Sequence, residues 1–348
     1  MQLSLVVPFY NRDVSSLVLL DTLTTLSLEG VEIIFVDDGS TDNTYSDLLS
    51  FQSAFSDLQL KLVQQSNKGP GGARNAGLKV AEGKYIWFVD SDDDITQEAI
   101  DFVRDSSTSD YDLINFNYLR NSIELSGVTV DPGSYTDAAE VRTILLGGFG
   151  PLWSNVYRRE MLIANDIYYP EYCYHEDSPL VFIYPFFVKS MLNTDILAYK
   201  YNEDNESIVR SKPNLRTLDR LYTAEYGFKK GLKHSPNKAE IAILKRTFVH
   251  LYLVSSVGIY STKKPSKQWL VMWRIMKNYR RLLKDLNISY SVFDAFSSKE
   301  SSSVFDDSSS KESSIKYKLF LCSHWMFSYA LPGDTAKHFD NVRRKAWE

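Results

Sequence analysis

The stretch "YIWFVDSDDD", residues 85–94, runs from an apolar segment into four carboxylates among five residues. Its first half has the aromatic and β-branched residues of a buried strand. Carboxylates this close repel one another and are costly to desolvate, so a positive partner is expected beside them. Asp90 and Asp92 suit Mg²⁺ or Mn²⁺, which take oxygen ligands. The stretch therefore predicts a divalent cation at a strand end. The alternative is a solvated acidic turn, with Asp93 and Asp94 capping the next helix.

The first 118 residues alternate between two periodicities. Segments rich in Val, Ile, Phe and Tyr predict strands at 3–9, 31–38, 58–65, 84–91 and 111–118. Amphipathic stretches between them predict helices at roughly 14–28, 42–55, 71–81 and 96–105. Expected caps at the starts of these helices are Asp13, Ser40 or Thr41, and Thr96. Strand–helix alternation predicts a mostly parallel sheet, in which ligands bind beyond the carboxyl ends of the strands.

Composition and length are those of a globular protein. The chain has 348 residues, 44% apolar and 24% charged, which predicts two domains or one domain with an appendage. Its two cysteines, Cys173 and Cys322, make no disulfide framework, which favours a reducing compartment. The first residues lack the features of a signal peptide, and no apolar run is long enough to cross a bilayer. We expect a cytoplasmic protein.

The net charge of −5 hides an asymmetry along the chain. Residues 1–112 hold 19 acidic and 7 basic side chains, a net of −12. Residues 229–290 hold 14 basic and 2 acidic side chains, a net of +12. The two halves could simply be solvated surfaces of opposite sign, or the basic half could meet an anionic surface.

Two further polar segments follow predicted strands. "VDDGSTDNT" (36–44) is either strand–turn–helix punctuation or a carboxylate site for a nucleoside. "NKGPGGARNAG" (67–77) is either a flexible loop or a diphosphate site. Its glycines would let the backbone approach a ligand, and Arg74 has the geometry to bind phosphate. It is neither a P-loop nor a dinucleotide-binding fingerprint.

The order "VVPFYNR … VDDGSTD … GGARNAG … FVDSDD … HED" resembles the family 2 glycosyltransferases over roughly residues 1–210. The resemblance implies the GT-A fold and an inverting enzyme that uses a nucleotide-activated sugar, most often a UDP-sugar. It places the nucleotide and the divalent metal, Mn²⁺ or Mg²⁺, on the strand-end motifs. The implied nucleotide residues are Pro8, Tyr10, Asp37, Asp38, Arg74, Asp90 and Ser91, and the implied metal ligands are Asp90 and Asp92.

The resemblance also implies a general base in the "ED" pair, Glu176 and Asp177, with Asp177 the better candidate. A local alternative is a helix cap, since Asp177 or Ser178 precedes Pro179. Trp153 and Tyr157 lie where the family commonly shapes the acceptor pocket. The alternative is that Trp153 belongs to the hydrophobic core. His175 is a neighbour of the base in one reading and a metal ligand in the other.

The carboxyl-terminal part carries fewer signals. "NESIVRS" (205–211) resembles the family's closing segment, in which Ser207 and Arg210 would fold over the phosphates, but Val209 departs from the pattern. Residues 263–286 predict a basic amphipathic helix that packs on the catalytic domain, meets a membrane surface or binds nucleic acid. No nucleic-acid module is visible, so a nucleic-acid partner is not expected. Residues 297–314 have the composition of a disordered linker, and 315–331 could be a short amphipathic helix.

These observations predict an α/β chain with a mostly parallel GT-A type sheet and a helical carboxyl-terminal extension. The expected boundaries are a catalytic domain at 1–211, a basic helical region at 212–296, a linker at 297–314 and an amphipathic segment at 315–348. The expected activity is metal-assisted transfer of a sugar, of hexosyltransferase type, from a nucleotide-sugar to a glycan or lipid-linked glycan of a bacterial surface polysaccharide, at the inner face of the membrane. The alternatives are a sugar nucleotidyltransferase and a catalytically silent carbohydrate-binding scaffold.

Overall fold

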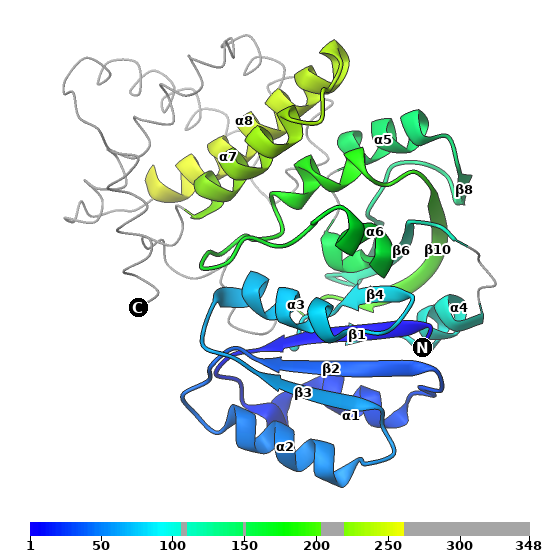
Figure 1. The fold of residues 1–348 in the computed structure, drawn as a ribbon, viewed down its shortest axis with the longest axis vertical. Coiled ribbons are helices and arrows are strands. Elements are labelled where there is room, and N and C mark those ends of the chain that lie inside the picture. Colours follow the sequence, from blue (N-terminus) through cyan, green and yellow to red (C-terminus); the bar gives the residue numbers. More distant parts are fainter. Residues whose placement is uncertain (106–109, 149–150, 203–218, 261–348) are drawn as a thin grey trace. The chain divides into compact units, whose positions relative to one another are not determined.

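The computed structural model describes residues 1–105, 110–148, 151–202 and 219–260. Within them, four parallel strands lie side by side in the order β3, β2, β1, β4, with their carboxyl ends at one edge (Figure 1). Their bounds are Leu3–Phe9 for β1, Val31–Asp37 for β2, Leu60–Gln64 for β3 and Tyr85–Phe88 for β4. The parallel strands predicted from the apolar segments are therefore confirmed.

The second half of the sheet is mixed. β9 inserts antiparallel between β4 and β6, and β10 pairs in parallel with β6. Three short strands, β5, β7 and β8, add antiparallel edges. The bounds are Asp94–Ile95 for β5, Leu113–Arg120 for β6, Ile123–Ser126 for β7, Gly133–Tyr135 for β8, Asn155–Arg158 for β9 and Met191–Lys200 for β10. β9 was not expected, because four residues are too few to show a period.

The first four helices lie close to their predicted ranges. They are α1 Val18–Thr25, α2 Thr44–Ala54, α3 Gly69–Val80 and α4 Gln97–Asp105. The later helices are α5 Ala138–Gly147, α6 Arg159–Ala164, α7 Asp219–Leu232 and α8 Lys238–Tyr260. Short 3₁₀ turns are η1 Val14–Ser16, η2 Leu152–Ser154, η3 Leu180–Phe182 and η4 Tyr184–Phe186.

The expected cap of α2 was wrong. Asn43 is the N-cap residue, with no side-chain cap bond, and the Asp42 carboxylate accepts the Thr44 amide at 2.9 Å. Ser40 and Thr41 instead contact Asn11, as described below. Asp13 does cap the short turn η1, by accepting a bond from the Ser15 amide.

Alternation along the parallel strands puts apolar residues on both faces of the sheet. Leu5, Val7 and Phe35 belong to a buried cluster that also contains apolar side chains of α1, α2 and α4. On the opposite face, Gly77 of α3 lies against Val6. Helices therefore cover both faces, as expected for strands that are buried on both sides.

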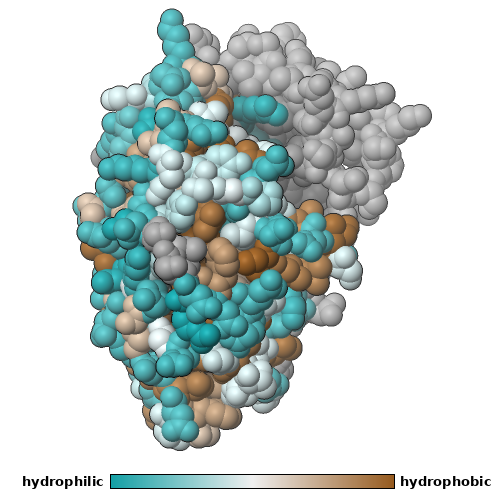
Figure 2. Space-filling model, turned by 90° about the vertical axis from the view of Figure 1, so that its right-hand side faces the viewer, coloured by the Kyte–Doolittle hydropathy of each residue, from teal (hydrophilic) through white to brown (hydrophobic). Residues whose placement is uncertain are grey.

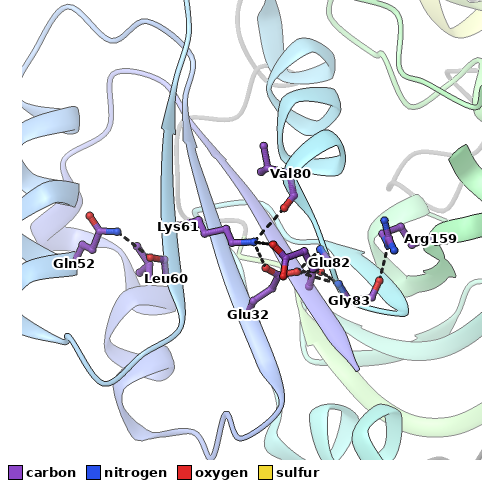
Figure 3. A network of polar contacts seen from close by, with 9 residues as sticks. Glu32, Gln52, Leu60, Lys61, Val80, Glu82, Gly83 and Arg159 are labelled. Carbon is purple, nitrogen blue, oxygen red and sulfur yellow. Dashed lines mark hydrogen bonds and ion pairs between the residues drawn. The ribbon is translucent and has the colours of Figure 1, made fainter. Parts of the chain in front are cut away.

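A polar network ties the chain together at the amino ends of the parallel strands (Figure 3). The Glu32 carboxylate is 1% exposed and accepts bonds from the Ser4 hydroxyl at 2.5 Å and from the amides of Glu82 and Gly83 at 2.6 and 3.0 Å. Lys61 pairs with Glu32 at 2.9 Å and with Glu82 at 2.8 Å. The network fixes the turn between α3 and β4. These two elements carry residues of the candidate site at their other ends.

Hydrophilic side chains are common on the face of the molecule shown in Figure 2. On this face apolar side chains form small patches among hydrophilic ones. No helix in the described part of the chain is long and apolar enough to cross a membrane. The predicted domain boundaries are not tested and stay predictions. Residues 205–211 and everything from 261 onward, including Cys322 and the three segments predicted there, lie outside the described residues.

Replacing Gly77 by Ala should destabilise the fold. An added Cβ would lie 2.3 Å from Cγ1 of Val6, so α3 or the strand must shift, at a cost of about 1–3 kcal/mol in the free energy of unfolding. Gly147→Ala is the matched control, because nothing lies within 4 Å of the added atom. Urea denaturation of both variants tests this. Equal stabilities would show that α3 packs less tightly than described.

Candidate active site

The loops after β1 and β2 are hydrogen-bonded to each other. Asn11 has the left-handed φ of 49° that asparagine tolerates. Its amide donates to the Ser40 hydroxyl at 3.0 Å, and its side-chain oxygen accepts the Thr41 amide at 2.8 Å. These contacts bring the predicted nucleotide residues of both loops to one edge. Pro8 is half-buried within β1, and Tyr10 is exposed just beyond it.

The two acidic residues at the end of β2 have different surroundings. Asp37 is fully buried and accepts bonds from the Ser40 amide at 3.3 Å and from Gln64 at 3.2 Å, so its carboxylate holds the loop together. Asp38 is 3% exposed and accepts bonds from the Gln65 side chain at 2.7 Å and the Lys68 amide at 2.9 Å. Burial raises the pKa of Asp38 to about 6, although these bonds oppose the rise.

The acidic turn after β4 is held by a tyrosine of β10. The Tyr199 hydroxyl donates to the Asp93 carboxylate at 2.6 Å and accepts the Asp90 amide at 3.1 Å. Asp93 is 2% exposed and also accepts the Asn202 amide at 2.9 Å. Burial, with the Asp90 charge, raises the pKa of Asp93 to about 8. The alternative of a solvated acidic turn is therefore wrong for Asp93, whose carboxylate is buried against Tyr199. Ser91 is also buried.

The positive partners expected beside the acids are found within the chain. Arg12 pairs with Asp92 at 3.0 Å, and Arg74 pairs with Asp90 at 2.5 Å. Burial raises the pKa of Asp92, and the Arg12 guanidinium opposes the rise. A divalent ion is therefore not the only cation that these carboxylates can meet.

Arg74 joins the acidic turn to Glu176, the first residue of the predicted "ED" pair. Its Nη2 contacts Asp90, its Nη1 contacts Glu176, and its guanidinium carbon lies 5.3 Å from the centre of the Tyr169 ring. The Arg74 side chain is 10% exposed. Burial disfavours the guanidinium cation, but Asp90 and Glu176 outweigh it and hold the pKa of Arg74 above its ordinary value. Arg74 was predicted to bind phosphate, but both of its terminal nitrogens contact carboxylates of the chain.

The glycine-rich motif docks another part of the chain. A Cβ at Gly71 would lie 2.3 Å from the Pro170 carbonyl oxygen, so only glycine fits there. Asn75 donates to the Tyr169 carbonyl at 2.8 Å and accepts the Tyr169 amide at 2.9 Å. The sequence predicted that a ligand approaches the glycines closely. At Gly71 the group that approaches is the chain segment that precedes Glu176.

Glu176 and Asp177 differ in exposure. Glu176 is buried, and desolvation together with Asp177 raises its pKa while Arg74 opposes the rise. Asp177 is partly exposed. The predicted helix cap is not found here, since η3 starts at Leu180 with Pro179 as its N-cap residue and no side-chain cap bond. His175 has a left-handed φ of 58°, and its carbonyl accepts the Ser178 amide. The chain therefore makes a tight turn, and Glu176 and Asp177 lie within it.

The two predicted acceptor aromatics are placed differently. Trp153 stacks on Tyr199 with ring centres 4.1 Å apart and on Tyr201 at 5.7 Å. Trp153 is partly buried next to the tyrosine that holds the acidic turn. Tyr157 is 3% exposed and its hydroxyl donates to the Leu152 carbonyl at 3.0 Å. As placed, Tyr157 is a core residue with no ring face open to an acceptor.

The donor set of the acidic turn fits a divalent ion. Oδ2 of Asp90 and Oδ1 of Asp92 accept no hydrogen bond from another described residue. In the described part of the chain no three acidic, His or Cys side chains converge as a metal cluster. Mg²⁺ and Mn²⁺ bound with a phosphate substrate ordinarily use one or two carboxylates, so two available oxygens suffice.

Comparison with known proteins shows which family and which fold the chain resembles. Residues 4–114 match the model of glycosyl transferase family 2. The match covers about a third of the chain, and this stretch is similar to the family's domain. EpsH of Bacillus subtilis (strain 168), a protein named as a glycosyltransferase, is 30% identical over 219 residues, which are 60% of this chain and 62% of EpsH. The match thus spans less than two thirds of that relative.

A second relative has a solved structure. The poly(ribitol-phosphate) beta-N-acetylglucosaminyltransferase TarS of Staphylococcus aureus (strain Mu50) is 32% identical over 181 residues, 49% of this chain and 30% of TarS. The crystal structure of TarS 1–349 in complex with UDP-GlcNAc has a TM-score of 0.61 at 22% identity and covers 77% of this chain and 78% of that one. This likeness confirms the expected GT-A fold.

The pH dependence of stability should reveal the buried Asp38. Its pKa is about 6 in the folded chain against an ordinary 3.8, so folding takes up a proton between these pH values. The stability that Asp38 contributes is full below about pH 4 and is lost as the pH rises through 6, by up to roughly 3 kcal/mol. Asp38→Asn keeps the accepting oxygen and cannot ionise. Urea denaturation from pH 4 to 7 should show the wild type losing stability relative to this variant. A constant difference would contradict it.

Replacing Arg74 by Met should destabilise the chain by about 3 kcal/mol or more, because Asp90 and Glu176 lose their buried counter-charge. The loss should shrink as the pH is lowered, since protonation of Glu176 removes one unpaired charge. Arg104→Met, which breaks an ion pair with Asp101 at the surface, should cost less than about 1 kcal/mol. Denaturation curves at pH 5 and pH 8 measure both effects. A small loss that does not change with pH would mean that Arg74 does not hold the two carboxylates together.

Proposed function

We propose that this chain transfers a sugar from a UDP-sugar to a hydroxyl group of a glycan, with inversion at the anomeric carbon. The observation that carries the proposal is the shared contact of Arg74 with Asp90 and Glu176. It brings the acidic turn, which suits a metal and a diphosphate, next to a pair of carboxylates that could accept a proton. Sugar transfer needs the metal and diphosphate site and the proton acceptor to lie no further apart than the length of one donor molecule.

The nucleotide end of the site would be formed by the loops after β1 and β2. Asp38, with Pro8 and Tyr10, would hold the nucleoside. The buried Asp37 would keep the loop shape rather than touch the donor. Asp90, Ser91 and Asp92 would face the diphosphate, with Asp92 and Asp90 as the carboxylates available to a divalent ion. When bound, Mg²⁺ or Mn²⁺ supplies positive charge that neutralises the leaving diphosphate.

Asp177 would act as the general base. Its carboxylate takes the proton of the acceptor hydroxyl while the acceptor oxygen bonds to the anomeric carbon. The bond from that carbon to the diphosphate oxygen breaks, and UDP leaves with the bonding electrons. Asp177 is more exposed than Glu176, and Glu176 is engaged by Arg74, so the base role suits Asp177 and the anchoring role suits Glu176. His175 would be a neighbour that shapes the backbone beside the base.

The setting proposed for this activity is the synthesis of a bacterial surface polysaccharide. TarS is named as an enzyme that acts on poly(ribitol-phosphate), and one of its structures contains UDP-GlcNAc, which makes UDP-GlcNAc the first donor to try. A lipid-linked acceptor would place the enzyme in the cytoplasm at the inner, anionic membrane surface. The net charge of +12 over residues 229–290 is compatible with that location.

Two other functions predict different products. A sugar nucleotidyltransferase would form the nucleotide-sugar itself and release pyrophosphate. A silent carbohydrate-binding scaffold would release no UDP from any donor. Two assays with Mn²⁺ separate the three functions: UDP release from a panel of UDP-sugars, and pyrophosphate release from UTP with sugar 1-phosphates. The family match favours UDP release.

Replacing Asp177 by Asn should lower kcat by about 10²–10⁴-fold with little change in the KM for the donor, because the proton acceptor is lost and the donor contacts stay. Asp195→Asn, at an exposed position of β10, is the matched control and should keep wild-type turnover. UDP release under saturating Mn²⁺ gives kcat, and NMR of the product gives its anomeric configuration. Wild-type turnover in the Asp177 variant, or retention of configuration, would contradict the proposal.

A further inference from the structure

Asp90 and Asp92 have counter-ions of different mobility. Arg74, on Asp90, is 10% exposed, also contacts Glu176 and lies over the Tyr169 ring, so it cannot leave without breaking several contacts. Arg12, on Asp92, is 34% exposed, and the contact with Asp92 is its only ion pair within the described residues. Arg74 is therefore a fixed partner, whereas the Arg12 side chain could move into solvent.

The backbone of Arg12 is held in place while its side chain reaches across the sheet edge. The Arg12 amide donates to the Thr44 hydroxyl at 2.8 Å, at the start of α2. Its guanidinium Nη2 contacts Oδ2 of Asp92, 80 residues further along the chain, at 3.0 Å. The Asp92 side chain is 18% exposed, and the turn that carries it is tied to Tyr199 through Asp90 and Asp93. Any rearrangement is thus expected in the Arg12 side chain and not in the turn.

A divalent ion on Asp92 would meet the Arg12 guanidinium at short range. Both are cations, and the carboxylate between them is mostly shielded from water, so their repulsion is weakly screened. The ion therefore binds Asp92 most tightly when Arg12 does not already compensate the charge of the carboxylate.

We propose that Arg12 and the divalent ion compete for the Asp92 carboxylate, so that Arg12 sets how tightly the chain binds the ion. This inference rests on the proposed function, in which Asp90 and Asp92 hold that ion. Binding of the ion would then release Arg12 from Asp92, while Arg74 stays on Asp90.

The test is a Mn²⁺ titration of the full chain, with free Mn²⁺ measured by electron paramagnetic resonance, in the absence and presence of saturating UDP. Arg12→Gln should bind Mn²⁺ about fivefold or more tightly than the wild type, the lower end of ordinary coupling between linked sites. Arg12→Lys, which keeps the charge but loses the planar fork, should fall between them. Arg104→Gln removes one positive charge from another surface ion pair and should not change the affinity.

Asp92→Asn completes the design. It should weaken Mn²⁺ binding, and adding Arg12→Gln to it should have no further effect, because the shared carboxylate is gone. In thermal melts, Arg12→Gln should show a lower Tm than the wild type without Mn²⁺ and a larger rise in Tm with it, a readout that is independent of activity.

The possible failures are distinguishable. Equal or weaker Mn²⁺ binding by Arg12→Gln, with binding still weakened in Asp92→Asn, overturns the inference and leaves the proposed metal site intact. Absence of Mn²⁺ binding in the wild type and in Arg12→Gln, with and without UDP, overturns the metal role of Asp90 and Asp92 and the inference with it.

Discussion

The buried guanidinium of Arg74 is the interaction on which the rest of the candidate site depends. It carries one positive charge between Asp90, just after β4, and Glu176, which is 102 residues from Arg74 in the chain. Without it, the buried Glu176 carboxylate and the partly exposed Asp90 carboxylate would each lose this counter-charge. The geometry explains how an acidic turn and a distant carboxylate pair can form one site.

The scaffold around Arg74 is built to keep it in place. Gly71 and Asn75 on the same helix dock the segment that leads to Glu176, and Gly77 seats that helix on β1. At the opposite end of α3, Glu32 fixes the turn into β4. Helix, strand and docked segment thus meet at defined positions, which suits a site that must hold a nucleotide and a proton acceptor in a fixed relation.

Much of this could be predicted from local sequence. Alternating strand and helix periods predicted the four parallel strands but not the antiparallel pairings of the second half, and the polar strand ends pointed to Asp38, Asp90 and Asp92. Contacts between distant residues left no such trace. Arg12 meets Asp92 across 80 positions, and Tyr199, which buries Asp93, lies in a strand whose sequence has no polar motif.

Two features that the local sequence did not reveal have the same physical origin. The glycines of "GPGGARNAG" predict a close approach, and at Gly71 the group that approaches is the chain's own Pro170. Arg12 was not singled out at all, since an arginine after a strand is ordinary until its partner is known. A local pattern shows which residues can approach something closely, and only the fold shows what they approach.

The most direct test of the central claim is a crystal structure of the full chain with UDP and Mn²⁺. The account predicts the ion on the Asp90 and Asp92 carboxylates with the diphosphate beside it, Arg74 still bridging Asp90 and Glu176, and Asp177 facing the open end of the diphosphate. A nucleotide and ion bound away from this edge of the sheet, or a site in which Glu176 and Asp177 are turned away from the diphosphate, would contradict it.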